Sequence, residues 1–225
     1  MRVPLDSRTL VSGVVAGAVL TLGAPAFSQA PFALVEAVHG SPGVEFMDYV
    51  VPGKVIKLKP RDTLVLGYLS SCWSETISGG TVMIGREQSE VQGGTVKREK
   101  VMCDGGRMEL TAKQANQSAG TSLRAPDEDM QTIYGLSPFV EARGRAALLV
   151  VRLDKPTEYF TAVLTEKRGA QRSYHDFADV NVVLTPGKTY RASIGSRQIV
   201  FKIDPNAKPG RVPLISRLLR FGQTS

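Results

Sequence analysis

The chain has 225 residues, of which 42% are hydrophobic and 22% are charged, and its formal net charge is +7. This apolar fraction can form a buried core, which excludes a chain that is disordered over most of its length. The length suits one large or two small units, and 22 glycines and 13 prolines favour short β elements separated by turns. Two histidines and two cysteines leave little material for a metal site, so we expect neither a metal nor a cofactor.

Residues 1–28 have the order of a secretory signal peptide. Arg2 and Arg8 give a weakly positive start, residues 9–22 carry no charge, and small residues with prolines follow. The uncharged run is short for a membrane span, which needs about 20 apolar residues. We therefore expect export to the periplasm, with an uncleaved N-terminal anchor as the alternative. Three small residues are possible cleavage points, in order of preference Ser28 and then Ala26 or Ala30.

The two cysteines are expected to form a disulfide. In an oxidising compartment Cys72 and Cys103 pair more readily than they serve as ligands or as a reduced nucleophile, which is the alternative. Closing a loop of about 32 residues would stabilise the fold by roughly 3–4 kcal/mol on the chain-entropy argument. We expect the bridge to join two strands of the first unit.

Residues 29–112 are predicted to form a small β-rich module. Residues 54–59 (KVIKLK) alternate apolar and basic side chains, which is typical of a strand with one solvated face. Glycine-rich turns separate the expected strands. These strands are predicted at residues 54–59, 63–69, 81–84, 95–103 and 108–111.

Residues 113–131 are predicted to be a polar linker or long loop, and residues 132–212 a second, β-sandwich-like module. The apolar run at residues 146–153 favours a strand that is buried on both faces. Thr185-Pro186-Gly187-Lys188 predicts a type II turn, because proline and glycine suit its two central positions. The strands of this module are expected at residues 146–153, 157–165, 180–184, 189–194 and 198–203.

Residues 213–225 are predicted to form a short amphipathic helix. Its apolar residues fall on one helical arc and two arginines lie opposite. We favour a helix that covers the second module; docking on a partner or a membrane surface is the alternative. The candidate interaction residues of this segment are Arg217, Arg220, Leu218 and Phe221.

Catalytic motifs are absent from the sequence. It contains no GxSxG elbow, P-loop, dinucleotide-binding glycine motif or HExxH, and His39 and His175 are isolated. We therefore expect a protein that is not an enzyme. The alternative is an envelope hydrolase of cell-wall or polysaccharide substrates, which would need a pair of carboxylates. The dispersed acids that could supply them are Glu45, Asp48, Asp62 and Glu75.

The positive charge suggests what an exported protein of this kind would meet. Envelope proteins, anionic envelope polymers and lipid head groups are the expected partners, with peripheral membrane contact as one form of binding. Basic residues are scattered and lack the interleaved aromatic side chains of a single-strand binder, so we expect no nucleic-acid partner. The oligomeric state is not predicted.

One segment, at about residues 52–91, resembles the FecR-like periplasmic β domain. The similar elements are Pro52-Gly53, the run Leu58-Lys59-Pro60-Arg61-Asp62-Thr63-Leu64, Gly67, Gly80-Thr81-Val82, Ile84 and Ser89-Glu90-Val91. The resemblance implies a β-rich module used for protein interaction or signal relay, with no catalytic residues. Members that regulate iron uptake carry a cytoplasmic segment and a membrane helix where this chain has the expected signal peptide, and the two cysteines are outside the family pattern. Together these observations predict a non-enzymatic periplasmic binding or scaffold protein.

Overall fold

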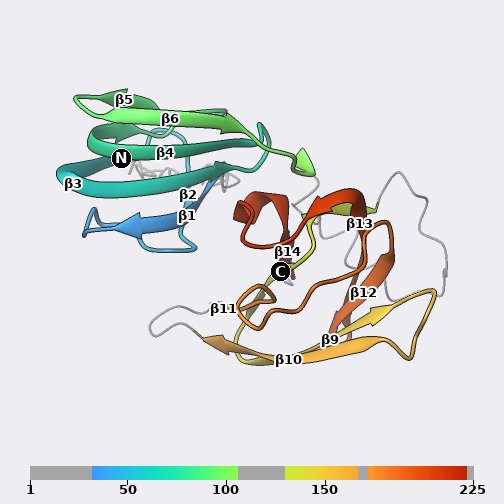
Figure 1. Cartoon of the computed structure of the whole chain (residues 1–225). Helices are drawn as coiled ribbons and strands as arrows, with labels where there is room; N and C mark the ends of the chain where they lie inside the picture. The colour runs from blue at the N-terminus through green and yellow to red at the C-terminus, as the bar shows by residue number, and fades with distance from the viewer. Residues whose placement is uncertain (1–31, 106–129, 167–171, 222–225) are drawn as a thin grey trace, which may run out of the picture.

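The structure, a computed structural model, describes residues 32–105, 130–166 and 172–221 and consists mainly of β-strands (Figure 1). The predicted all-β class is confirmed. The expected signal peptide, the strand at residues 108–111 and nearly all of the linker at residues 113–131 lie outside the described residues. Within the described ranges, no helix is long and apolar enough to cross a membrane.

The first sheet has six strands, in the order β2-β1-β3-β4-β5, and β6 also pairs with β4. All of these pairs are antiparallel. Their apolar faces enclose a core that includes Leu64, Leu66 and Ile77. The strands are β1 (Ala33–His39), β2 (Tyr49–Val50), β3 (Val55–Tyr68), β4 (Trp73–Met83), β5 (Glu90–Gln92) and β6 (Thr95–Lys100).

The alternation of apolar and basic side chains at residues 54–59 correctly predicted which side chains are buried. Ile56 and Leu58 are buried, while the lysines between and beside them are exposed. The two strands expected at residues 54–59 and 63–69 are, however, one strand, β3. Its register against β4 shifts between Leu58 and Thr63, so an irregularity replaces the expected turn.

The predicted disulfide is present at one end of this sheet. Cys72 and Cys103 are joined, with their Cα atoms 5.6 Å apart, and they tie the β3–β4 turn to the segment after β6. Trp73, next to the bridge, pairs with Lys100 across β4 and β6, and the lysine ammonium lies 5.1 Å from the indole centroid. The bridge therefore reinforces an existing strand pair.

The second sheet has eight strands in the order β14-β8-β11-β10-β9-β12-β13-β7, with parallel pairs β13–β7 and β14–β8. Side chains from β9, β12 and β13 meet those from β8 and β14 in one core. Gln131 of β7 donates a hydrogen bond to the Leu218 carbonyl of β14, at 2.8 Å, which links the two ends of the strand order. The elements are β7 (Gln131–Gly135), β8 (Phe139–Arg143), β9 (Ala146–Arg152), β10 (Tyr159–Glu166), β11 (Arg172–Asp176), β12 (Thr189–Ile194), β13 (Arg197–Lys208), η3 (Leu214–Ser216) and β14 (Leu218–Arg220).

Three local predictions in this half of the chain are wrong. Residues 180–184 do not form a strand: 180 and 181 lie in a turn, where Asn181 has a φ of 56°, and 182–184 have no regular secondary structure. The segment from residue 213 is not a helix but a 3-10 turn followed by β14, because β8 offers it backbone partners. Strand β9 is buried on one face only: Leu148 and Val150 are buried, whereas Leu149 on the opposite face is exposed. By contrast, Gly187 has the positive φ, 70°, that the predicted type II turn requires.

The two sheets share a third apolar cluster, here called the junction cluster. Leu34 and Leu69 of the first half pack there against Phe139, Ile215 and other residues of the second half. The carboxylate of Glu36, on β1, accepts a hydrogen bond from the Ile215 backbone N–H at 2.9 Å. The C-terminal segment is therefore packed between the two sheets.

Candidate functional site

The residues predicted to form a C-terminal interaction site lie mostly inside the fold. Leu218 belongs to the junction cluster and Phe221 to the core of the second sheet. Arg217 is 2% exposed and donates two hydrogen bonds to the Asp176 carboxylate, at 2.6 and 3.0 Å. Arg220 is partly buried and ion-paired. These four residues stabilise the packing of the C-terminal segment, and only Arg220 among them is partly exposed.

A polar cluster around Glu141 lies where the two sheets meet. The buried Glu141 carboxylate accepts a 2.5 Å hydrogen bond from the Tyr49 hydroxyl and pairs with Arg172 at 3.5 Å and Arg220 at 3.4 Å. Burial, together with the nearby negative charge of Glu141, raises the pKa of Tyr49 well above its usual value of 10. Tyr49 is therefore a hydrogen-bond donor to Glu141, whose carboxylate also contacts Arg172 and Arg220.

The hollow beside this cluster is too small to hold a substrate. Its volume is about 40 Å³, whereas pockets for small molecules are typically several hundred. It is lined by Glu45, Phe46, Met47, Asp48, Glu141, Arg172 and Tyr174. The junction thus serves to hold the two sheets together, and Arg172 does so directly by donating to the Met47 carbonyl at 3.0 Å.

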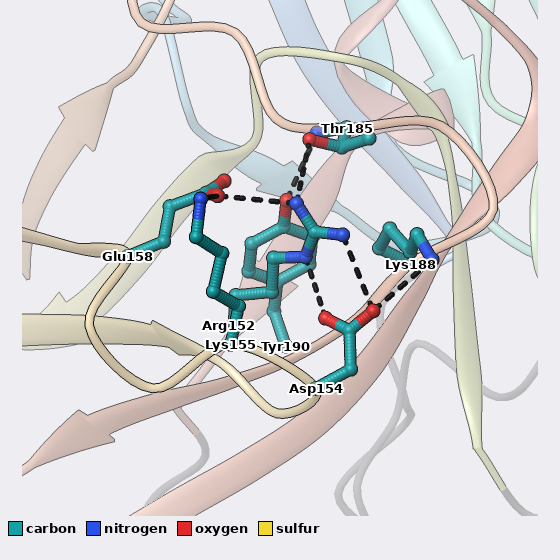
Figure 2. Close-up of polar contacts among 7 residues, drawn as sticks. All are labelled: Arg152, Asp154, Lys155, Glu158, Thr185, Lys188 and Tyr190. Atoms are coloured by element: carbon teal, nitrogen blue, oxygen red, sulfur yellow. Dashed lines mark hydrogen bonds and ion pairs between the residues drawn. The ribbon is translucent and has the colours of Figure 1, made fainter.

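A second polar cluster surrounds Arg152 at the end of β9 (Figure 2). The guanidinium donates to Asp154 at 2.5 and 3.2 Å, to Glu158 at 3.1 Å and to the Thr185 hydroxyl at 3.4 Å. Lys188 completes the contacts of Asp154 with an ion pair at 3.0 Å. Figure 2 shows the carboxylates of Asp154 and Glu158 on opposite sides of the guanidinium.

The Arg152 cluster is built to fix a turn. Hydrogen bonds from Arg152 and Lys188 lower the pKa of Asp154 to about 2, so this carboxylate is ionised at any physiological pH. The Tyr190 hydroxyl accepts the Thr185 backbone N–H at 2.9 Å. With each charge already paired, the cluster orders the β9–β10 connection and the turn before β12, and it offers no poised acid or base.

A third cluster occupies the first sheet. The fully buried Glu75 carboxylate accepts a hydrogen bond from Arg98 at 2.6 Å and from the Ser89 backbone N–H at 3.1 Å. The Tyr68 hydroxyl lies 2.8 Å from the Ser89 hydroxyl, and burial raises the pKa of Tyr68 to about 12. This arrangement satisfies a buried charge inside a strand, as packing demands.

The acids considered for the hydrolase alternative are likewise used in local structure. The Asp48 carboxylate accepts the backbone N–H of Glu45 at 2.8 Å, and that of Asp62 accepts the N–H of Lys59 at 3.0 Å. Among the described residues, no three His, Cys, Asp or Glu side chains are placed to share a metal ion. Asp48 and Asp62 therefore act as turn-stabilising residues.

One surface of the second sheet has apolar side chains that the fold does not cover. We call it the β9–β10 face. Leu149 lies on β9, Leu153 in the turn directly after it, and Tyr159 and Val163 on β10, with exposed fractions of 39%, 37%, 60% and 51%. The register places Leu149 opposite Thr161, between Tyr159 and Val163 along β10, so these side chains form one patch. Contiguous exposed apolar surface of this kind marks interaction sites.

The sequence analysis did not predict this face. In β10 the inward residues Phe160, Ala162 and Leu164 alternate with the outward residues Tyr159 and Val163, and both sets are largely apolar. A pattern that is apolar on both faces predicts burial on both faces. Only the absence of a covering layer distinguishes the two outcomes, and that is a property of the tertiary structure.

The chain matches no known family model, and neither the curated protein sequences nor the solved structures contain a significant match to it.

Proposed function

We propose that this protein is an exported, periplasmic, non-enzymatic binding or scaffold protein of the cell envelope that docks a partner protein on the β9–β10 face. The observation that carries the proposal is the exposed apolar patch of Leu149, Leu153, Tyr159 and Val163. The signal-peptide pattern of residues 1–28 supports the location. The resemblance of residues 52–91 to the FecR-like domain supports a role in protein interaction or signal relay.

The chemistry of the face favours a protein over an anionic polymer. None of its four exposed residues is charged, and among the described residues of β9, β10 and β12 that share this side of the sheet, Arg191 of β12, opposite Val151, is the single cation. Binding to a polyanion depends on free cationic groups, whereas protein interfaces have apolar centres rich in aromatic residues such as tyrosine. The partner should therefore present an apolar surface of its own.

The test is capture from envelope extract with matched variants. Leu149→Thr combined with Val163→Thr removes apolar area while keeping residues that suit a strand. The control is Val55→Thr with Met83→Thr, an exposed apolar pair directly opposite each other on β3 and β4. Surface substitutions of this kind change stability little, so both variants should fold.

The expected result is a protein, identified by mass spectrometry, whose capture falls about tenfold or more in the face variant and is unchanged in the control. Equal capture by the wild type and the face variant would exclude the β9–β10 face as the docking site. N-terminal sequencing of the protein from the periplasm tests the location separately, and a mature chain that begins at Met1 would contradict cleaved export.

A further inference from the structure

Among the residues that the structure describes, strand β10 has a free backbone edge along most of its length. On one side it pairs with β9 from Tyr159 to Leu164. On the other side it pairs with β11 only at its last two residues, Thr165 and Glu166. From Leu164 back to Tyr159 it has no register with β11. In the view of Figure 1, β10 runs along the lower margin of the second sheet with no labelled strand beyond it. Although β10 is an interior strand by order, residues 159–163 therefore form an edge.

The hydrogen-bond pattern between β9 and β10 shows which residues of β10 direct their backbone N–H and C=O groups away from β9. Arg152 donates its backbone N–H to Glu158, and Leu153 donates to Thr189 of the segment that begins β12. Even-numbered residues of β9 thus bond to β10, and odd-numbered ones bond to β12. Because the register places Tyr159 opposite Val151, the bonded residues of β10 are the even-numbered ones. The N–H and C=O groups of Tyr159, Thr161 and Val163 consequently point to the free edge.

This edge lacks the features that usually protect one. Exposed edges are guarded by lysine, proline or a charge that points toward the pairing side. From Tyr159 to Thr165 the chain has no charged residue and no proline. Within the described part of the chain, no backbone hydrogen bond from outside β9 reaches the three free residues. The edge is therefore competent to accept another strand.

We propose that two copies of this chain pair through this edge, with the two β10 strands antiparallel and a two-fold axis at Thr161. Pairing centred there places Tyr159 opposite Val163 of the second copy and Thr161 opposite its own equivalent. The three free residues are symmetric about Thr161, so one register satisfies the donors and acceptors of both copies, with about two bonds at each of three pairs. With no charge on the edge, identical copies meet without electrostatic repulsion.

The dimer would join the two β9–β10 faces into one surface of four neighbouring strands. Tyr159 of one copy would lie beside Val163 of the other on the exposed side, because paired residues share a face. Self-pairing does not rest on the proposed function. It can occur whether or not a partner protein binds, and a partner can bind a single copy.

Sedimentation equilibrium of the mature chain measures the association directly. The wild type should be dimeric at high micromolar concentration. Thr161→Pro should weaken the dimer by about thirtyfold, because each copy loses one central N–H donor while the bonds to β9 are untouched. Thr161→Lys, which places two ammonium groups opposite each other, should also weaken the dimer. Its matched control, Thr95→Lys at the exposed start of β6, should not.

A cysteine at the axis provides an independent readout. In a bonded antiparallel pair the Cα atoms are about 5.5 Å apart, within the range for a disulfide. Thr161→Cys should therefore give a covalent dimer under mild oxidation, faster than Thr95→Cys does. A wild type that stays monomeric, or a dimer that both Thr161→Pro and Thr161→Lys leave intact, would overturn the proposal. So would oligomers larger than a dimer, or equal cross-linking at positions 161 and 95.

Discussion

The ion pair between Arg217 and Asp176 is the structural feature whose loss should cost most. Arg217 is nearly fully buried and makes four hydrogen bonds, two to Asp176, one to the Ser137 carbonyl and one to the Val212 carbonyl, at 2.6 to 3.0 Å. The substitution Arg217→Met keeps much of the apolar stem but removes all four donors. It leaves a buried Asp176 carboxylate that still accepts a hydrogen bond from the Ala178 N–H, at 2.9 Å.

Breaking a buried pair by removing one partner costs about 3–5 kcal/mol, because the other charge stays desolvated. For a chain of this size each kcal/mol lowers the melting temperature by about 2–4 °C, so Arg217→Met should lower it by roughly 10 °C. Urea denaturation of the mature chain, followed by circular dichroism, measures the free energy of unfolding. A second substitution, Asp176→Leu, should restore most of the loss, since it removes the unpaired charge.

The control is a pair of the same chemistry at the surface. Arg211 and Asp179 also form an ion pair, but their side chains are 72% and 55% exposed. Arg211→Met should change the free energy of unfolding by less than about 1 kcal/mol, because water replaces the lost contacts. If Arg217→Met destabilises no more than Arg211→Met, or if the double variant is no more stable than Arg217→Met alone, burial is not what gives the pair its importance.

Three further predictions concern the fold. Replacing Cys72 and Cys103 by serine should lower the free energy of unfolding by about 3–4 kcal/mol without changing secondary structure, and equal urea midpoints would contradict this. Gly67→Ala should cost about 1–3 kcal/mol in the same assay, since its Cβ would meet the side chain of Ile215 at 2.5 Å; no loss would mean that the junction adapts. Burial lowers the pKa of His175, so the folded state favours the neutral ring, and stability should fall as pH drops through about 6.5. His175→Gln should remove that component of the pH dependence, and an unchanged profile would assign it to other groups.

The sequence predicted β3, the end of β4 and β6 in the first sheet because their signals are local, but it did not predict β1, β2, β5 or most of β4. Alternation at residues 54–59 identified β3 and its buried side, and glycines marked the turns. The disulfide was predicted from the cysteine count together with the expected oxidising compartment. The sequence could not show that residues 54–69 form one strand, because the irregularity between Leu58 and Thr63 depends on the register against β4.

The C-terminal segment shows why the rest was not predictable. Leu214, Ile215, Leu218 and Leu219 have the spacing of a helical face, yet Leu218 packs in the junction cluster and Leu219 in the core of the second sheet. A strand, with alternate side chains on opposite faces, can fill two cores, whereas a helix of this length gains little stability on its own. The deciding partner, β8, lies about 80 residues earlier in the chain.

The same reasoning explains why the candidate site is an apolar face and a strand edge rather than a cluster of charges. A buried carboxylate such as Glu75 or Glu141 must be paired, since leaving it unpaired costs several kcal/mol, so folding alone accounts for the polar clusters. A solvated strand edge costs the fold little, because water bonds to its backbone groups, and nothing in folding requires Tyr159 or Val163 to be apolar on the open side. Side chains that packing does not explain are the ones on which binding can be argued, and on that ground we propose that this chain binds through β9 and β10.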